Sequence, residues 1–284
     1  QKDQCGYEDD PFGFVQGLTT GAERYMFYLT GGDGAGDNHL KNIVRLGGSA
    51  SKLHLLLLLA AVNMDEQALT HLKALLESMV YYSTVNQIKT NELERLYAQW
   101  CKQIREIHTD EELTSFINNK IKPTISQWKV NNRSNFMRIG FDSMQQYRVK
   151  FILARITKYV DVRRKNGGDA SNVAEFYEGG IEIEHIMPQK YSAAYGISED
   201  DYNAAKQRLG NLTLLEKTIN ASIGDDAFAS KSEAYRQSAY YLTRSIAQLD
   251  DVGQQTAINR MNQKLRSWSS WGPSMIEDRQ AILY

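Results

Sequence analysis

Two short stretches of the chain have the hydrophobic pattern of β-strands. Residues 181–187 alternate apolar and polar side chains with period two, which is typical of a half-buried strand, and the run stops at Pro188. A second short apolar run follows at 209–215. We therefore predict strands over 181–187 and 210–215, separated by a loop that contains a small helix over 198–209.

The rest of the chain is predicted to be mostly helical. It has only four prolines and many Leu, Ala, Gln, Lys and Glu residues, which favour helix. The apolar run 53–62 predicts a buried core helix, in which His54 is expected to be a hydrogen-bonded core histidine. Asp65 and Asp110 are expected N-caps, because each begins an acidic first turn. Helices are predicted over 22–29, 51–62, 65–81, 90–106, 110–121, 124–130, 142–164, 226–248, 252–268 and 273–284.

Length and composition set the class of protein. The chain has 284 residues, 42% of them hydrophobic, which suffices for one large domain or two smaller ones. Cys5 and Cys101 lack metal-type spacing, so we expect a reducing cytoplasm and no disulfide framework. No signal peptide is visible, and no apolar run approaches the roughly 20 residues that a membrane span needs. The start at Gln1, without Met, and the end at Tyr284 indicate a piece of a longer protein.

The net charge of −1 conceals an uneven distribution. Residues 1–112 carry a net charge of −6 and residues 171–284 carry −4, whereas residues 113–170 carry +9. This basic segment directly precedes the first predicted strand, a location that suits a surface holding a polyanion beside a reactive site. Its candidate nucleic-acid contacts are Arg148, Lys150 and Arg155. A solvated Lys/Arg-rich helical face is the alternative interpretation of the same charge.

Acidic, imidazole and amide side chains lie on the two predicted strands, or just after them, in an order that suits phosphodiester hydrolysis. Glu184 and His185 end the first strand, Asn211 begins the second, and Asn220 follows it. A neutral imidazole can take a proton from water, since an unperturbed His titrates near ~6.5. Mg²⁺, or Mn²⁺ in its place, prefers oxygen ligands such as carboxylates and amides. We therefore expect His185 to be the general base, Glu184 and Asn220 the metal ligands, and Asn211 the residue that shapes the turn and orients His185.

These residues belong to a longer pattern that resembles the HNH nuclease domain at the C-terminus of GmrSD-type restriction endonucleases, which are phage-defence proteins. The pattern runs from Glu184-His185-Ile-Met-Pro188 through Leu-Gly-Asn211-Leu-Thr-Leu-Leu and Asn220 to Phe-Ala-Ser-Lys231. It is looser over 147–180 and over the closing helices. The resemblance implies a ββα-metal fold and metal-dependent nicking or cleavage of double-stranded DNA, including phage DNA.

The resemblance also assigns roles by position. His185 matches the general base, Glu184 the acidic metal ligand, Asn211 the central Asn, and Asn220 the last residue of the motif. Two departures stand out: many HNH enzymes have Asp where Glu184 stands, and many have His where Asn220 stands. Water and phosphate could complete such a two-ligand site, and the remaining candidates for it are Asp225 and Asp226.

The family pattern extends to residues outside the motif. Lys231 stands where a family lysine falls and is expected to contact the scissile phosphate of DNA as a point charge. Such proteins also carry an N-terminal ParB-like nucleotidase domain with an Asp-Gly-Gln-Gln-Arg motif, which this sequence lacks. We therefore expect this nucleotidase or sensor domain to be a partner missing from the chain.

The resulting prediction is a mainly α protein in two parts. Residues 1–140 form a helical linking or DNA-contact region, and residues 141–284 form an HNH nuclease domain whose ββα-metal motif is embedded in helices. The function is divalent-metal-dependent DNA nicking in antiphage restriction. The alternative is a non-catalytic DNA-binding or protein-interaction module that uses the basic segment 113–170, and RNA is an alternative substrate.

Overall fold

Helices dominate the protein. The computed structural model describes residues 8–32, 37–47, 52–251, 253 and 256–284. Within these ranges it contains many helices and one two-stranded sheet, which confirms the expected mainly helical class. The chain divides into two compact units, Gln1–Asn132 and Arg133–Tyr284. In the same ranges, no helix combines the length and the apolar character that crossing a bilayer demands.

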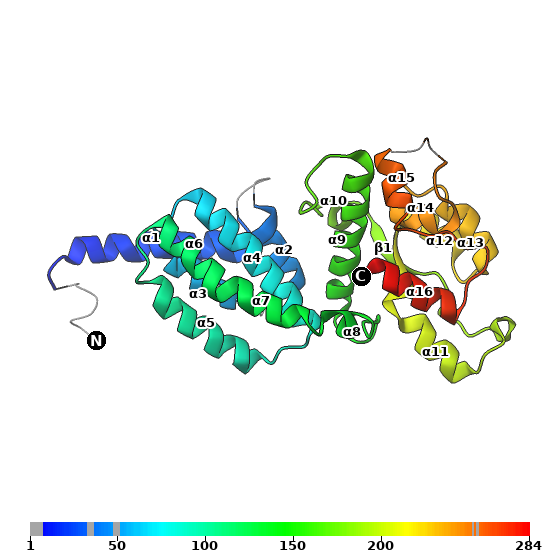
Figure 1. Cartoon of the computed structure of the whole chain (residues 1–284), viewed down its shortest axis with the longest axis horizontal. Helices are drawn as coiled ribbons and strands as arrows, with labels where there is room; N and C mark the ends of the chain where they lie inside the picture. Colours follow the sequence, from blue (N-terminus) through cyan, green and yellow to red (C-terminus); the bar gives the residue numbers. More distant parts are fainter. Residues whose placement is uncertain (1–7, 33–36, 48–51, 252, 254–255) are drawn as a thin grey trace. The chain divides into compact units, whose positions relative to one another are not determined.

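The described part of the first unit is helical throughout (Figure 1). The apolar run predicted as a core helix forms α3, which packs against α5 and buries Leu55, Leu57 and Leu58. Burial removes the apolar surface of these leucines from water, and this stabilises the folded unit. The helices of the unit are α1 (Pro11–Thr30), α2 (Asn38–Gly47), α3 (Leu53–Ala60), α4 (Glu66–Val85), α5 (Thr90–Ile104), α6 (Asp110–Phe116), the π-helical turn η2 (Ile117–Ile121) and α7 (Lys122–Lys129).

Local interactions in this unit confirm one predicted helix start and correct another. The Asp65 carboxylate caps α4 by accepting a hydrogen bond from the backbone N–H of Ala68 at 2.7 Å. The predicted cap at Asp110 is wrong by one residue, because Thr109 is the N-cap of α6 and forms a capping box with Glu112.

The histidine of the core helix also differs from the prediction. His54 is buried, yet neither of its ring nitrogens has a hydrogen-bond partner in the described part of the chain. Burial lowers the pKa of His54 to about 4, so the ring is neutral at physiological pH.

The second unit surrounds a β-hairpin with helices. Its elements are α9 (Gln146–Lys165), α10 (Glu175–Glu178), β1 (Ile181–His185), η3 (Ala193–Tyr195), α11 (Glu199–Gln207), η4 (Leu209–Asn211), β2 (Leu212–Glu216), α12 (Lys217–Ile223), α13 (Phe228–Tyr235), α14 (Tyr241–Ala247), α15 (Ala257–Asn262) and α16 (Pro273–Leu283). The short helix α8 (Asn132–Phe136) lies at the division between the units.

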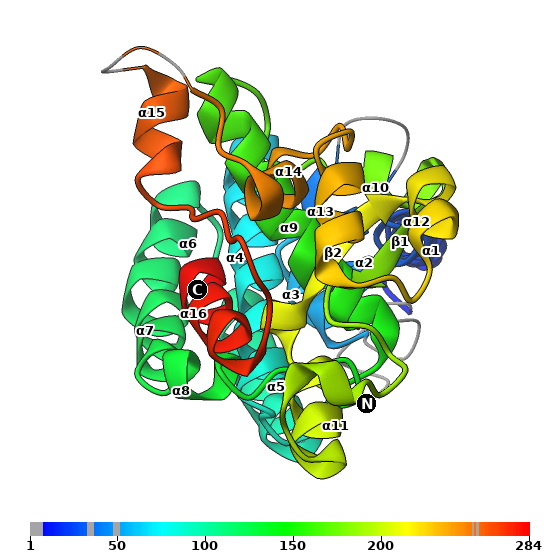
Figure 2. The ribbon, with the colours of Figure 1, turned by 90° about the vertical axis from the view of Figure 1, so that its right-hand side faces the viewer.

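The hairpin pairs the two strands that the sequence predicted. β1 and β2 are antiparallel, with Ile181 opposite Glu216 and His185 opposite Leu212. Residues 212–215 are all buried, because α9 and α14 pack against β2 while α12 contacts both strands (Figure 2). α12 begins at the residue after β2, so the chain order at the hairpin is strand, strand, helix.

Two predicted long helices are shorter in the structure. The predicted helix 226–248 is divided into α13 and α14. Glu216 accepts hydrogen bonds from Ser238 Oγ and from the backbone N–H of Ala239, which holds the intervening residues in a turn. The predicted helix 252–268 is reduced to α15. Cys5, residues 33–36 and the starts of the predicted helices 51–62 and 252–268 lie outside the described residues, and Cys101 is a free, buried thiol.

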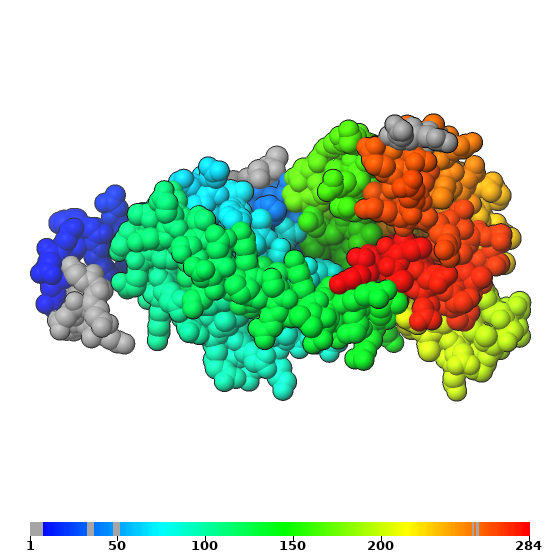
Figure 3. Space-filling view, in the orientation of Figure 1, coloured from blue at the N-terminus to red at the C-terminus, as the bar shows by residue number. Residues whose placement is uncertain are grey.

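Helix α16 ties the start of β2 to distant parts of its unit. Its surface, red in Figure 3, lies between the orange segment and the yellow-green α11. The buried Arg279 guanidinium donates hydrogen bonds to the carbonyls of Gly210 (2.8 Å) and Leu212 (2.7 Å). Gln280 accepts from the Gly210 N–H and donates to the carbonyls of Phe136 and Ile139. Gly210 is required here, because a Cβ would lie 2.0 Å from the Ile276 carbonyl oxygen.

Candidate functional site

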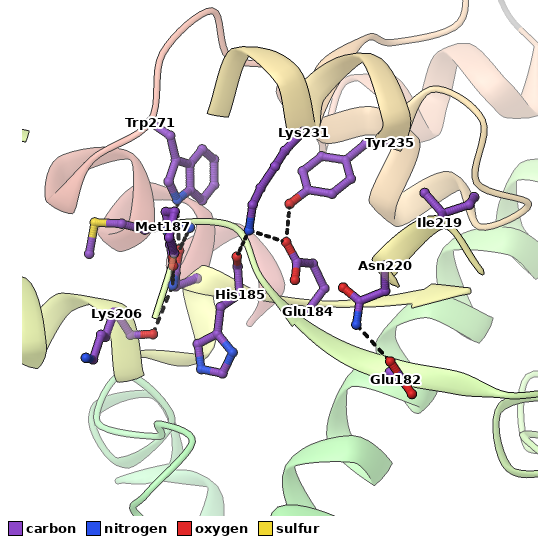
Figure 4. A network of polar contacts seen from close by, with 12 residues as sticks. Glu182, Glu184, His185, Met187, Lys206, Ile219, Asn220, Lys231, Tyr235 and Trp271 are labelled. Carbon is purple, nitrogen blue, oxygen red and sulfur yellow. Dashed lines mark hydrogen bonds and ion pairs between the residues drawn. The ribbon is translucent and has the colours of Figure 1, made fainter. Parts of the chain in front are cut away.

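The end of β1 presents its side chains to two different environments. Successive residues of a strand point to opposite faces, so Glu182 and Glu184 share one face and His185 occupies the other. Figure 4 shows the imidazole of His185 pointing away from the Glu184 carboxylate. Glu184 and His185 are therefore neighbours on β1, but their side chains point to opposite sides of the strand.

Glu184 is held by two side chains of α13. Its Oε1 accepts hydrogen bonds from Lys231 Nζ (2.7 Å) and from the hydroxyl of Tyr235 (2.8 Å), and all three residues are buried. Burial raises the pKa of Glu184, while the neighbouring Lys231 ammonium opposes this rise. Sequence reasoning missed Tyr235, although it stands four residues after Lys231 and therefore on the same helix face.

The structure gives Lys231 an environment that differs from the predicted one. A lysine that contacts DNA needs an accessible ammonium, but Lys231 is only 1% exposed. Its Nζ donates to Glu184 and also to the carbonyl oxygen of His185 at 2.8 Å. In this arrangement Lys231 stabilises the end of β1 from inside the protein, and the expected contact with a phosphate is not available to it.

His185 is a buried, neutral imidazole. Its ring packs edge-on against Phe141, with 4.8 Å between the ring centroids. Burial lowers the pKa of His185 to about 4, and the positive charges of Lys231 and Lys206 act in the same direction. Within the described residues, Nε2 is buried and has no hydrogen-bond partner. The ring is therefore neutral, as a general base requires, and its Nε2 is not occupied by another side chain of the described residues.

The side-chain amide of Asn211 makes four hydrogen bonds, which connect the start of β2 to three other segments of the unit. Its Oδ1 accepts hydrogen bonds from the backbone N–H of Met187 (2.7 Å) and from Trp271 Nε1 (2.9 Å). Its Nδ2 donates to the carbonyls of Met187 (3.0 Å) and Lys206 (2.9 Å). These four bonds use the full capacity of the amide. Asn211 therefore shapes the turn that follows His185.

Asn220 and Glu182 form the accessible part of the site. Asn220, from α12, donates a 2.9 Å hydrogen bond from Nδ2 to Glu182 Oε2, and both side chains are partly exposed (Figure 4). The prediction placed Asn220 beside Glu184 and overlooked Glu182. Period-two alternation was the available signal, because it puts Glu182 on the same strand face as Glu184.

The oxygen donors at this face suit a hard divalent cation with few protein ligands. The described residues contain no group of three or more His, Cys, Asp or Glu side chains arranged for a metal. A Mg²⁺ site needs fewer protein side chains, because the ion is commonly bound by one or two carboxylates. Waters and substrate phosphates complete its octahedral coordination. Glu182 and Asn220 offer one carboxylate and one amide oxygen of the required type, whereas Glu184 is already paired with Lys231. Asp225 and Asp226 are exposed in the turn between α12 and α13.

The predicted basic contacts on α9 are used partly inside the unit. Lys150 donates to the carbonyl of Ile181 at 2.7 Å, and the Arg155 guanidinium donates to the carbonyl of Ala170. Arg148 lies over the ring of Tyr147. The aliphatic stems and hydrogen bonds of these side chains hold the segment that leads into β1. Each of the three side chains is also partly exposed, so part of it faces solvent.

Comparison with known families gives one result for this chain. The family model described as GmrSD restriction endonucleases, C-terminal domain, matches residues 128–284. The matched range contains the hairpin, α12, α13 and α16, and thus every candidate residue described above. Among curated proteins, no sequence matches the chain.

Proposed function

Because the chain belongs to the GmrSD restriction endonuclease family through its C-terminal domain, we propose that residues 141–284 are an HNH-type, divalent-metal-dependent DNA endonuclease that nicks duplex DNA. Family membership implies endonuclease activity, with DNA as the substrate. The single observation that supports the HNH chemistry is the strand–strand–helix order, in which Glu182, Glu184 and His185 lie on β1, Asn211 precedes β2, and Asn220 lies on α12.

His185 is the proposed general base. The neutral ring can accept a proton from the attacking water at its unprotonated nitrogen, which is the step that an imidazole performs as a general base. The ring is buried against Phe141, so substrate binding must open it to water. Asn211 fixes the backbone after His185, and Lys231 fixes the carbonyl of His185 itself.

Glu182 and Asn220 are the proposed metal-binding pair, with Glu184 beside them on the same strand face. A bound Mg²⁺ or Mn²⁺ would supply neutralisation of the charge that develops on the phosphate and the leaving oxygen. Asn220 Nδ2 donates a hydrogen bond to Glu182 Oε2, so the two side chains are already in contact.

The remaining parts of the chain have proposed roles in the larger protein. Residues 1–140 are the helical region that joins the nuclease to a nucleotidase or sensor domain outside this chain. The protein acts in antiphage restriction. The partly exposed Arg148, Lys150 and Arg155 lie on the helix before the hairpin and can add positive potential where a DNA backbone approaches.

A supercoiled plasmid assay tests this function. The wild-type chain is expected to convert supercoiled DNA to the open-circular form with Mg²⁺ or Mn²⁺ and not with EDTA. His185→Ala should lower the rate about 100-fold or more, the usual contribution of a general base. His71→Ala removes an exposed histidine of α4 and should nick at the wild-type rate. Undiminished nicking by His185→Ala would exclude His185 as the general base. Faster cleavage of RNA than of DNA would show that RNA is the substrate.

One structural observation favours the non-catalytic alternative. Glu184 is neutralised by Lys231 and the His185 ring is buried, as in a site that serves only stability. In that case the chain would bind plasmid DNA through the basic segment 113–170, without metal-dependent relaxation. The binding would weaken steeply with salt, since it depends on phosphate contacts.

A further inference from the structure

A cavity lies next to the segment that leaves β1. Its volume is about 640 Å³, within the range of small-molecule sites, and its wall begins at Pro188, three residues after His185. The candidate residues Glu184, His185 and Asn220 are not part of its lining. The cavity is therefore a separate feature that the proposed catalytic chemistry does not explain.

The walls of this cavity are aromatic and its rim is charged. Tyr191, Tyr195, Phe228 and Trp271 contribute rings, and Lys190 and Asp225 contribute charges of opposite sign. Aromatic faces stack on nucleobases of any sequence, and a lysine at the rim attracts the attached phosphate. An Asp carboxylate accepts hydrogen bonds from the N–H groups of bases, including the ring N–H of thymine.

The aromatic wall is held rigidly. The hydroxyl of Tyr202 donates to the carbonyls of Pro188 (2.8 Å) and Lys190 (2.9 Å), and the Tyr202 ring packs edge-on against both Tyr191 and Tyr195. Trp271 stacks on Phe228 with 5.4 Å between the ring centroids, and its indole N–H binds Asn211. The residue that shapes the turn after His185 therefore also fixes one wall of the cavity.

The chain itself connects the cavity to the proposed general base. Pro188, which lines the cavity, is only three residues after His185, and three residues span at most about 10 Å. Asn211 also hydrogen-bonds both the backbone N–H of Met187, next to Pro188, and the indole of Trp271 in the cavity wall. A strand whose phosphate reaches His185 would thus have a neighbouring nucleotide at the mouth of the cavity.

We infer that this cavity binds a nucleobase of the DNA strand that is cut, unstacked from its neighbours and placed against Tyr195 and Tyr191, with Lys190 on its phosphate. The inference rests on the proposed function for the position of the strand. It adds a binding site that grips a base next to the scissile phosphate. A base is preferred over a plain apolar ligand because the cavity combines stacking surfaces with one cationic and one anionic group.

The test compares two single-stranded oligonucleotides of equal length and charge, oligothymidylate and a fully abasic strand. Their dissociation constants are measured by fluorescence anisotropy with the His185→Ala chain and Mg²⁺, so that the strands stay intact. The base-bearing strand should bind about tenfold or more tightly, the usual effect of one aromatic stacking contact. This preference should disappear in a chain that also carries Tyr195→Ala and remain in one that carries Tyr195→Phe.

Two further variants keep the test decisive. Ala194→Leu narrows the cavity without removing a ring contact and should abolish the preference even if Tyr195→Ala fails to fold. Tyr159→Ala removes a partly exposed tyrosine of α9 outside the cavity and should retain it. Thymidine monophosphate as competitor separates a free nucleotide from a strand, since only a free-nucleotide site would be emptied by it at equal concentration.

The outcomes separate this inference from the proposed function. Equal binding of the two strands by the starting chain, or a preference that persists in both Tyr195→Ala and Ala194→Leu, would overturn the base site. Plasmid nicking by the wild-type chain is scored independently. A preference that depends on the cavity, in a chain that never nicks DNA, would retain the base site and reject the nuclease.

Discussion

Lys231 and Glu184 form a buried ion pair, with 2.7 Å between Nζ and Oε1 and side-chain exposures of 1% and 7%. The same ammonium donates to the carbonyl of His185, so one cation of α13 holds the last two residues of β1. Tyr235 adds a second hydrogen bond to Glu184. Removal of one member of such a pair leaves an uncompensated charge in the interior, which is far more costly than loss of an exposed pair.

Lys231→Met should therefore destabilise the second unit strongly. The expected loss is about 3–5 kcal/mol in the free energy of unfolding, measured by urea denaturation. Lys217→Met, at an exposed lysine of α12, is the matched control and should change stability by less than about 0.5 kcal/mol. The double variant Lys231→Met/Glu184→Gln should recover part of the loss, because no unpaired charge remains. Equal losses at positions 231 and 217 would contradict the ion pair.

Glu182 and Asn220 can be tested as metal ligands by direct titration. Glu182→Gln and Asn220→Ala should each weaken Mn²⁺ binding, measured by calorimetry, by at least the roughly 10- to 100-fold typical of losing even an outer-shell partner. Glu199→Gln, in the exposed first turn of α11, should bind Mn²⁺ as the wild type does. If neither of the first two variants alters the titration, their hydrogen bond serves only to hold α12 on β1.

Asn211→Ala should weaken the turn after His185 and the attachment of Trp271. The substitution leaves the Met187 and Lys206 backbone groups and the indole N–H of Trp271 without their partner. The expected cost is about 3 kcal/mol or more, read as a lower melting temperature. The emission of Trp271 should also change, which a general loss of stability below the transition would not produce. A variant with unchanged emission and an unchanged melting temperature would show that these bonds contribute nothing.

The sequence was sufficient for the elements that depend on local patterns. Alternation predicted β1, a short apolar run predicted β2, and the acidic first turn predicted the Asp65 cap, because each of these signals lies within a few residues. Thr109 was missed although Thr109 and Glu112 have the spacing of a capping box, which is also a local signal. The division of α13 from α14 depends on Glu216, which is 22 residues before Ser238 and gives no local signal.

Side-chain partners in the site were less predictable than its elements. Position in the family pattern selected Glu184 and Lys231 but could not show that they bind each other across 47 residues. The period-two alternation of β1 could have identified Glu182 as a candidate metal ligand, because it lies on the same strand face as Glu184. The orientation of Asn211 depends on Trp271, 60 residues away, and such contacts follow only from the packed fold.

The buried His54 makes the stability of the first unit depend on pH. The pKa of His54 is about 4 in the folded protein, below its ordinary value of 6.5. Between these values the unfolded chain binds the proton more readily, so stability falls as the pH is lowered from 6.5 to about 4, by about 3 kcal/mol in total. His54→Leu should flatten this dependence in urea denaturation series at several pH values. An equally steep loss in the variant would exclude His54 as the cause.

Gly210→Ala should disrupt the contact between η4 and α16. The new Cβ would lie 2.0 Å from the carbonyl oxygen of Ile276 and 3.0 Å from Gln280 Cβ, so one of the two segments must move. We expect a melting temperature several degrees lower, and faster amide hydrogen exchange at Leu212 and in α16. Gly167→Ala, where an added Cβ meets no atom within 4 Å, is the control and should leave both measurements unchanged.

The bonds from Arg279 to Gly210 and Leu212 join residues 69 and 67 positions apart. During translation, the hairpin emerges from the ribosome long before the guanidinium that satisfies these carbonyls exists. Contacts between distant positions form late, because a long loop must close first. The carbonyls of Gly210 and Leu212 thus receive their buried partner only after almost all of residues 133–280 have been synthesised, so the start of β2 is completed last.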